Sequence, residues 1–308
     1  MNRCEILNSA ILTVVAMFAL TEIALAEPAF GYDLQTDVVY GQGIIAPDGI
    51  EMSRDLMLDV YTPTDSTGDA ARPAVVLVHG GAYYRGGRRQ PPYRIEGAVH
   101  SRQEDYAQML APLGYVVFVI EYRLAPELPV PQTSLDHPDL QDPLTMAPDS
   151  GIERTQYVRE VMGLPTISDE EVREIGIASI IAAAEDVKKA VDYVRANAAI
   201  YNIDPDRIAI GGHSAGAAAT INAAYGLDAE VKAIFPLSPG GGGFDLAKVL
   251  QKPDLPAILV MQSQNDLAIS AETIPLMLAE MKRAGHTYEF AWGSGIWSFL
   301  SDRRSLTR

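Results

Sequence analysis

The sequence predicts an α/β fold in which helices flank a mostly parallel central sheet. After residue 70, short apolar runs alternate with longer helix-patterned segments, as in βαβ units. Most of these runs are apolar throughout, which is typical of parallel strands covered on both faces. With 308 residues and 48% hydrophobic content, the chain can form one large domain with a sizeable core.

The strands and helices follow from these patterns. Buried strands are expected at residues 72–79, 115–121, 207–211, 231–237 and 257–262. The run 56–61 is interrupted by Asp59, so it and residues 37–40 are expected to form an antiparallel pair at the edge of the sheet. Helices are expected at residues 103–113, 177–198, 215–225 and 271–284.

Residues 126–176 interrupt this alternation. Their first half is dense in Pro, Asp and Ser, and the second half predicts one or two short polar helices, one opened by a capping box from Ser168 to Glu171. The segment is too long for a plain connection. Two interpretations remain open, a mobile lid over an active site and a surface excursion.

The first 26 residues predict a secretory signal peptide. Arg3 precedes an apolar run at residues 11–20, and Ala24-Leu25-Ala26 before Glu27 has the form of a cleavage site. A membrane anchor is the alternative, but the run is shorter than the ~20 residues that span a bilayer. We therefore expect a secreted or periplasmic protein whose single domain covers residues 27–308.

Composition limits the classes of molecule that the chain is expected to bind. The formal net charge of −16 disfavours nucleic acid and anionic membranes, because both would repel the chain. A small-molecule substrate fits better. Cys4 is the only cysteine and would leave with the signal peptide, so neither a disulfide nor a thiolate metal site is expected.

A serine lies between a predicted strand and a predicted helix, in the run Gly-His-Ser-Ala-Gly at residues 212–216. On such a sharp turn the serine backbone is strained, which only small neighbours such as Gly212 and Gly216 permit. The serine hydroxyl then projects above the sheet. The pattern predicts that Ser214 is a nucleophile.

A second glycine-containing turn, His79-Gly80-Gly81-Ala82, ends an earlier strand. Glycines allow backbone N–H groups to point at a tetrahedral oxyanion, so this turn is a candidate oxyanion hole. Gly81 and Ala82 are the expected donors, with Ala215 as the third. A plain strand-terminating turn is the alternative, and His79 is expected to be structural.

Tyr83 and Tyr84 follow this turn directly. Aromatic side chains in that place either shape a substrate pocket or pack against the 126–176 insertion. Both interpretations remain open.

Four segments together resemble the hormone-sensitive-lipase-like and carboxylesterase branches of the α/β-hydrolase superfamily. They are HGG at 79–81, EYRLAPE at 121–127, IDPDRI at 203–208 and GHSAG at 212–216. The resemblance covers roughly residues 50–127 and 177–295. It implies an α/β-hydrolase fold, hydrolysis of carboxylic esters, and no metal or organic cofactor. The lid-like insertion after the fourth strand departs from the family pattern, because many relatives carry a long insertion after the strand that follows the nucleophile helix, whereas residues 240–252 are a short segment here.

The resemblance also assigns the triad acid to Asp266, in the run QSQND after a strand. The chain order, serine before aspartate, agrees with this assignment. A turn or helix-capping aspartate is the alternative.

The triad histidine is missing from its expected place. The resemblance puts it in a glycine-rich loop after the strand 287–292, but residues 293–299 read GSGIWSF. Of the five histidines, His286 is nearest, yet it precedes that strand and would lie at the opposite edge of the sheet. Its catalytic role is therefore doubtful.

A reading-frame change would explain the loss. Read one base later from codon 296, suitable silent codons give Ser-Gly-His-Phe-Tyr-Pro, and the charged tail that ends at Arg308, where a closing helix is expected, agrees with this. Sequencing the gene around codon 296 tests the idea. Three functions remain open: an esterase impaired by the missing base, an inactive binding protein on a hydrolase scaffold, and an amidase or lactonase with the same site.

Overall fold

The computed structural model describes residues 30–64, 70–91, 94–95, 98–99, 102–263 and 268–293. The predicted signal peptide, Asp266 and the loop after residue 293 lie outside the described residues.

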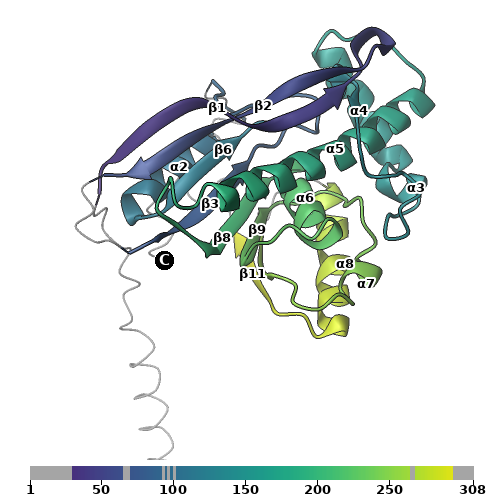
Figure 1. Cartoon of the computed structure of the whole chain (residues 1–308). Helices are drawn as coiled ribbons and strands as arrows, with labels where there is room; N and C mark the ends of the chain where they lie inside the picture. Colours follow the sequence, from purple (N-terminus) through teal and green to yellow (C-terminus); the bar gives the residue numbers. More distant parts are fainter. Residues whose placement is uncertain are drawn as a thin grey trace, which may run out of the picture.

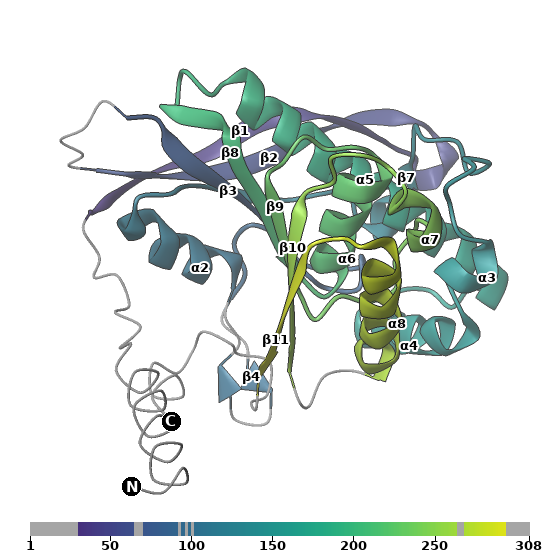
Figure 2. The same ribbon diagram turned by 90° about the horizontal axis from the view of Figure 1, so that it is seen from below.

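A nine-stranded sheet runs through the molecule in the order β11-β10-β9-β8-β3-β6-β2-β1-β7 (Figures 1 and 2). Strands β3, β6, β8, β9, β10 and β11 are parallel, and β1, β2 and β7 form an antiparallel edge. The strand bounds are β1 Tyr32–Ile45, β2 Met52–Pro63, β3 Arg72–Val78, β6 Val116–Ile120, β7 Pro129–Val130, β8 Ile203–His213, β9 Ala233–Leu237, β10 Ala257–Ser263 and β11 Tyr288–Gly293. The predicted mostly parallel α/β sheet and its antiparallel edge pair are confirmed.

Short strands β4 (Arg94–Ile95) and β5 (Ala98–Val99) form a separate pair. The α-helices are α2 Gln103–Leu110, α3 Pro143–Met146, α4 Asp149–Val161, α5 Asp169–Ala196, α6 Ala215–Ile221, α7 Leu246–Val249 and α8 Ala268–Ala284. Short 3-10 turns lie at Pro47–Gly49 (η1), Ala111–Leu113 (η2) and Ala125–Glu127 (η3), and a π-helical turn, η4, covers Asn222–Gly226. None of the helices in these described ranges is long and apolar enough to cross a membrane.

Two predicted boundaries were wrong. The short helix expected from Ser168 is not separate, because α5 begins at Asp169 and continues unbroken through Gly176. The capping box itself is present, with Ser168 Oγ accepting from the Glu171 N–H at 3.2 Å. Strand β1 is 14 residues long, although only residues 37–40 were predicted, because most of its side chains are exposed and give no apolar signal.

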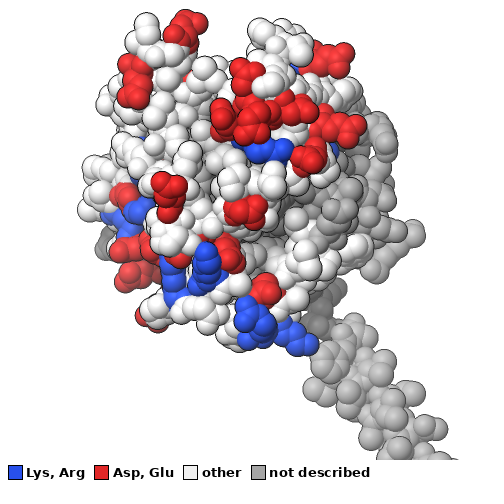
Figure 3. Space-filling model, turned by 90° about the vertical axis from the view of Figure 1, so that its right-hand side faces the viewer, with Lys and Arg blue, Asp and Glu red and all other residues white. Residues whose placement is uncertain are grey.

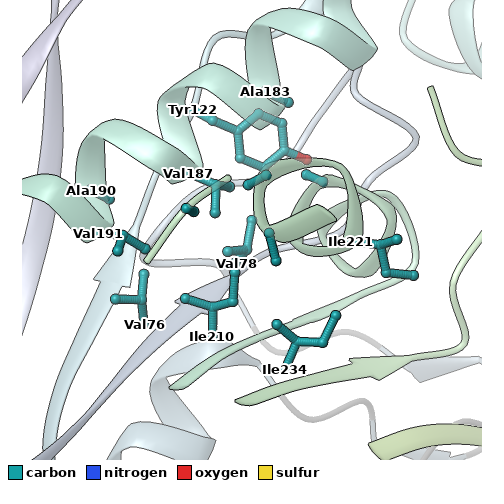
Figure 4. Close-up of a cluster of buried hydrophobic side chains, with 14 of the residues drawn as sticks. Val76, Val78, Tyr122, Ala183, Val187, Ala190, Val191, Ile210, Ile221 and Ile234 are labelled. Carbon is teal, nitrogen blue, oxygen red and sulfur yellow. The ribbon is translucent and has the colours of Figure 1, made fainter. Parts of the chain in front are cut away.

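The main core lies between the sheet and the helices α5 and α6. Figure 4 shows Val76, Val78 and Ile210 of the central strands together with Val187 of α5 and Ile221 of α6. The small alanines of α5 allow this long helix to approach the sheet closely. Helix α2 packs on the opposite face in a smaller cluster (Figure 2). The sheet is thus held from both sides.

The 126–176 insertion follows β6, the fourth strand of the main sheet in chain order, as predicted. It is joined by backbone hydrogen bonds to the segment after β9. The Gln141 N–H donates to the Gly243 carbonyl at 3.0 Å, and the Asp245 N–H donates to the Asp139 carbonyl at 2.8 Å. These bonds fix the insertion to the segment that follows β9.

A buried arginine joins the insertion to α5. Arg123 is fully buried, and its backbone N–H and guanidinium both donate to the Asp186 carboxylate at 2.8–3.1 Å. The guanidinium also donates to Glu185 at 2.9 Å and to the carbonyls of Ile44 and Val130 at 3.1 and 2.9 Å. One side chain therefore ties β1, β7 and α5 together at the start of the insertion.

We expect the Asp186→Ala substitution to destabilise the fold strongly. Removing one partner leaves the buried Arg123 charge poorly compensated, at a cost of about 3 kcal/mol in the free energy of unfolding. Urea denaturation measures the change. The matched control is Asp192→Ala, whose pair with Lys188 is exposed and should cost less than about 0.5 kcal/mol. Equal losses in both variants would contradict the structural role given to Arg123.

Candidate active site

Ser214 occupies a sharp turn between β8 and α6. Strand β8 ends at His213 and α6 begins at Ala215, which leaves Ser214 alone between them, with φ 54° and ψ −117°. A non-glycine residue in this region is strained by about 1–3 kcal/mol. The Ser214 N–H donates to the Leu237 carbonyl of β9 at 2.9 Å, which anchors the turn to the neighbouring strand.

The two glycines of the motif are required by backbone packing. A Cβ built on Gly212 would lie 2.5 Å from the carbonyl carbon of Gly216. A Cβ on Gly216 would lie 2.4 Å from the carbonyl oxygens of both Val78 and His79. Helix α6 therefore begins directly against the end of β3, and side chains at positions 212 and 216 would push it away.

The His-Gly-Gly turn lies against Ser214. A Cβ built on Gly80 would lie 2.7 Å from the His213 carbonyl oxygen and 3.3 Å from Ser214 Cβ. The structure thus brings together the two segments that the sequence predicted to meet. They meet because β3 and β8 are parallel neighbours and their carboxyl ends share one edge of the sheet.

The turn after β3 has the conformation expected of an anion-binding concavity. Gly81, Ala82 and Tyr83 have φ of 121°, 55° and 62°, and successive residues of such conformation can aim N–H groups inward. The hydrogen bonds within the turn use the N–H groups of Tyr84 and Arg85, which donate to the Gly81 carbonyl at 3.0 and 3.2 Å. This leaves the N–H groups of Gly81 and Ala82 outside the turn's own bonding.

His79 is a structural residue. Its ring is 2% exposed, stacks on Tyr122 with ring centroids 4.3 Å apart, and lies with Nδ1 2.7 Å from the Gly80 carbonyl. The Tyr122 hydroxyl donates to the His79 carbonyl at 3.1 Å. Burial lowers the pKa of His79 from 6.5 to about 4. The ring is therefore neutral near pH 7 and supports the turn, as predicted.

His286 lies at the other edge of the sheet. Tyr288 pairs with Ile258 near the amino ends of β11 and β10, and His286 precedes that pair. Its Nε2 is 2.8 Å from the Tyr225 hydroxyl, which also donates to the Pro256 carbonyl. Ser214 follows the carboxyl end of β8. The assignment of His286 as a catalytic residue is therefore wrong, because His286 precedes β11 and lies at the edge of the sheet opposite Ser214.

The predicted acid, Asp266, lies outside the described residues. The strand before it ends at the correct edge, however. Met261 of β10 pairs with Leu237 of β9, and Leu237 pairs with His213. Gly293, at the end of β11, pairs with Ser263 of β10. The strands after which the triad acid and base are expected, β10 and β11, therefore both end at the edge where Ser214 lies.

The two tyrosines after the oxyanion turn differ in their surroundings. Tyr84 is buried in a cluster with Ala125 and with Val158 of α4, so it packs against the insertion. Tyr83 is half-buried and lies edge-on to Tyr122 at 6.3 Å. The packing interpretation therefore describes Tyr84, and a substrate-binding role stays a prediction for Tyr83.

Sequence reasoning missed a cavity of about 300 Å³. Its walls come from α6, η4, the segment 239–249, α8 and two insertion residues, Gln141 and Thr145. Asn222 of η4 lines it. The run of glycines at 240–243 was the only sequence signal, and it does not by itself indicate a cavity. Within the described ranges no group of three or more His, Cys, Asp or Glu side chains could hold a metal ion.

Comparison with known proteins supports the fold. The BD-FAE family model matches residues 169–273, about a third of the chain. Thermogutta terrifontis esterase 2 phosphorylated by paraoxon matches with TM-score 0.53 and 19% identity over 86% of this chain and 83% of that one. MGS-M1, an α/β hydrolase enzyme from a Medee basin deep-sea metagenome library, matches with TM-score 0.51 and 16% identity over 86% and 82%.

The butyrate-bound Est2 of Thermogutta terrifontis has TM-score 0.51 and 18% identity over 86% and 84% of the two chains. The search of curated proteins found no match. At these identities the likeness establishes that the chain has the α/β-hydrolase fold.

The buried His79 should make the fold acid-sensitive. The pKa of His79 is about 4 in the folded protein and 6.5 ordinarily. Between pH 4 and pH 6.5 its imidazole therefore binds a proton more readily in the unfolded chain than in the folded one. The free energy of unfolding should therefore be highest above pH 6.5 and fall by about 3 kcal/mol as the pH drops to 4. NMR of the histidine rings and urea denaturation at each pH measure this. A His79 ring that titrates near pH 6.5 in the folded protein would contradict it.

Proposed function

We propose that this chain is a serine hydrolase of carboxylic esters, with Ser214 as the nucleophile. One observation carries the proposal: the strained Ser214 turn lies in contact with the His-Gly-Gly turn, with Gly80 against Ser214 Cβ. A nucleophile and a set of backbone donors at one edge of a sheet are the two parts that acyl transfer needs together.

The proposed chemistry has two stages. Ser214 Oγ attacks the ester carbonyl, a base takes its proton, and the N–H groups of Gly81, Ala82 and Ala215 stabilise the oxyanion. The C–O bond to the alcohol then breaks, the base gives its proton to the departing alcohol oxygen, and an acyl-enzyme remains. Water attacks this intermediate, releases the acid and restores the serine. Asp266 would orient the base if a histidine were present.

The missing histidine limits the rate of this reaction. Loss of a triad member leaves a residual rate of about 10³–10⁴-fold over water, which comes from the oxyanion hole and substrate binding. The proposal is therefore a weak esterase for the chain as written. An amidase or lactonase would use the same groups, and a fully inactive binding protein remains the second candidate because residues 293–299, where the family histidine is expected, contain no histidine.

A small neutral ester is the proposed substrate class. The Thermogutta terrifontis esterase Est2 with butyrate bound, whose fold this chain shares, supports a short acyl group. Clusters of Asp and Glu dominate the charged side chains on the face shown in Figure 3. Such a surface disfavours anionic substrates. The predicted signal peptide would place the reaction outside the cytoplasm.

The Ser214→Ala variant tests the nucleophile. Wild-type protein should hydrolyse p-nitrophenyl butyrate slowly and react covalently with a fluorophosphonate, and the variant should lose both because the attacking oxygen is gone. Mass spectrometry of the intact protein measures the label. Ser134→Ala, a change of an exposed serine in the insertion, is the matched control and should keep both. Absence of turnover and of labelling in wild-type protein would favour the inactive binding protein.

A gain of activity tests the missing base. The double variant Trp297→Gly, Ser298→His restores the Gly-His-Phe run of the shifted reading frame, because Phe299 already follows. It should raise kcat/KM for p-nitrophenyl butyrate by about 100-fold or more, and the rate should rise with pH near neutrality as the new imidazole loses its proton. The same double variant on a Ser214→Ala background should gain nothing. An unchanged rate on the Ser214 background would contradict the frameshift explanation.

A further inference from the structure

The cavity beside η4 contains a buried polar atom without a partner. Asn222 is 1% exposed, and its Oδ1 accepts from the Gly243 N–H at 2.9 Å. Because that donor must face an oxygen, the orientation of the amide is fixed and Nδ2 points elsewhere. Among the described residues Nδ2 has no hydrogen-bond partner, and Asn222 lines the cavity. A bound molecule that supplies an acceptor oxygen would satisfy this donor.

The wall that carries Asn222 is firmly held. Phe244 is buried and covers Gly226, where a Cβ would lie 2.2 Å from the Phe244 ring. On its other side, Phe244 is bridged to Leu140 of the insertion, and its carbonyl accepts from Gln141 Nε2 at 3.1 Å. Figure 2 shows α6, α7 and α8 next to one another around this region. The Phe244 segment of the cavity wall is therefore anchored on two sides.

The lining of the cavity defines the kind of ligand. Most of its wall is apolar, contributed by Ile221, Phe244, Leu246, Val249, Leu276 and Met277. Two carboxylates lie at it, Asp245 and Glu280, and no Lys or Arg does. The Asp245 carboxylate already accepts from the Ala247 N–H, and Glu280 pairs with Arg283. An anionic ligand would be repelled, whereas an uncharged apolar molecule with one acceptor oxygen fits.

We propose that this cavity binds an uncharged, largely apolar group that carries a carbonyl-type oxygen, and that Asn222 Nδ2 donates to that oxygen. The wall of the cavity is connected to the Ser214 turn through the segment after β9. Pro239 lines the cavity and lies two residues after Leu237, whose carbonyl accepts from the Ser214 N–H. The bound group is thus the part of the ester remote from the reacting carbonyl, an assignment that rests on the proposed function. The preferred substrates are esters with a second oxygen acceptor.

Binding of acetophenone and ethylbenzene tests the donor. These probes have nearly the same shape and differ in one carbonyl oxygen. Ligand-observed NMR titration of the full chain gives both dissociation constants. The readout is their ratio, because a change in the cavity that affects both probes equally leaves the ratio unchanged. In wild-type protein Asn222 should favour acetophenone. In Asn222→Leu this preference should fall by about tenfold, within the range expected for loss of one hydrogen bond to a buried donor.

Two further variants guard against loss of structure. Asn222→Asp keeps an acceptor for the Gly243 N–H but removes the Nδ2 donor, so at pH 8 it should lose the preference as Asn222→Leu does. Leu276→Ala changes an exposed lining residue and should weaken the binding of both probes while leaving the ratio of their dissociation constants unchanged. An unchanged ratio in both Asn222 variants, or no binding of either probe, would overturn the proposal and indicate that Nδ2 meets only a water molecule.

Protection of Ser214 tests the link to the reaction. Saturating acetophenone should slow fluorophosphonate labelling of Ser214 in wild-type protein at least several-fold and should have much less effect in Asn222→Leu at the same concentration. Labelling that proceeds unchanged while the probe is bound would overturn the assignment to the substrate. Absence of any labelling would overturn the proposed function and that assignment with it, while the acetophenone preference would still establish the ligand site.

Discussion

Close backbone packing at the ends of β3 and β8 is the constraint on which the site depends. Three segments meet there without side chains between them: Gly80 against Ser214, Gly212 against Gly216, and Gly216 against the carbonyls of Val78 and His79. A Cβ on Gly212 or Gly216 would lie within 3.0 Å of backbone atoms, and a Cβ on Gly80 would lie 2.7 Å from the His213 carbonyl oxygen. The parallel pairing of β3 with β8 supplies the positions, and the glycines supply the approach. The buried His79 ring then holds the turn from behind by stacking on Tyr122.

The insertion completes this arrangement from the other side. Arg123 ties its start to α5, and backbone bonds at residues 139–141 and 243–245 tie its middle to the segment after β9. That segment carries Phe244 and forms the wall of the Asn222 cavity. Residues 139–141 of the insertion are therefore held in place, and the interpretation of residues 126–176 as a lid stays a prediction. The insertion shapes the cavity by holding the glycine loop, and its motion is not needed for this.

The sequence was informative at positions where one physical requirement explains the type of residue found. A serine between two glycines after a strand indicates a strained turn, and a glycine pair after a parallel neighbour indicates donors at the same edge. It was uninformative where solvent exposure or packing between distant segments determines the structure. The exposed β1 has no apolar pattern, and α5 runs through Gly176 without a break. The Asn222 cavity is lined by segments that range from Gln141 to Glu280 in the sequence, so no local pattern could indicate it.

The strained serine helps to separate the candidate functions. A binding protein has use for the cavity and for Asn222, but not for Ser214 at φ 54°, a conformation that costs about 1–3 kcal/mol. Nor does it need the turn after β3, with three successive residues at positive φ. These two strained turns lie against each other, at the edge where β10 and β11 also end. Their joint presence favours a hydrolase that lacks a base over a scaffold that never had a reaction to perform.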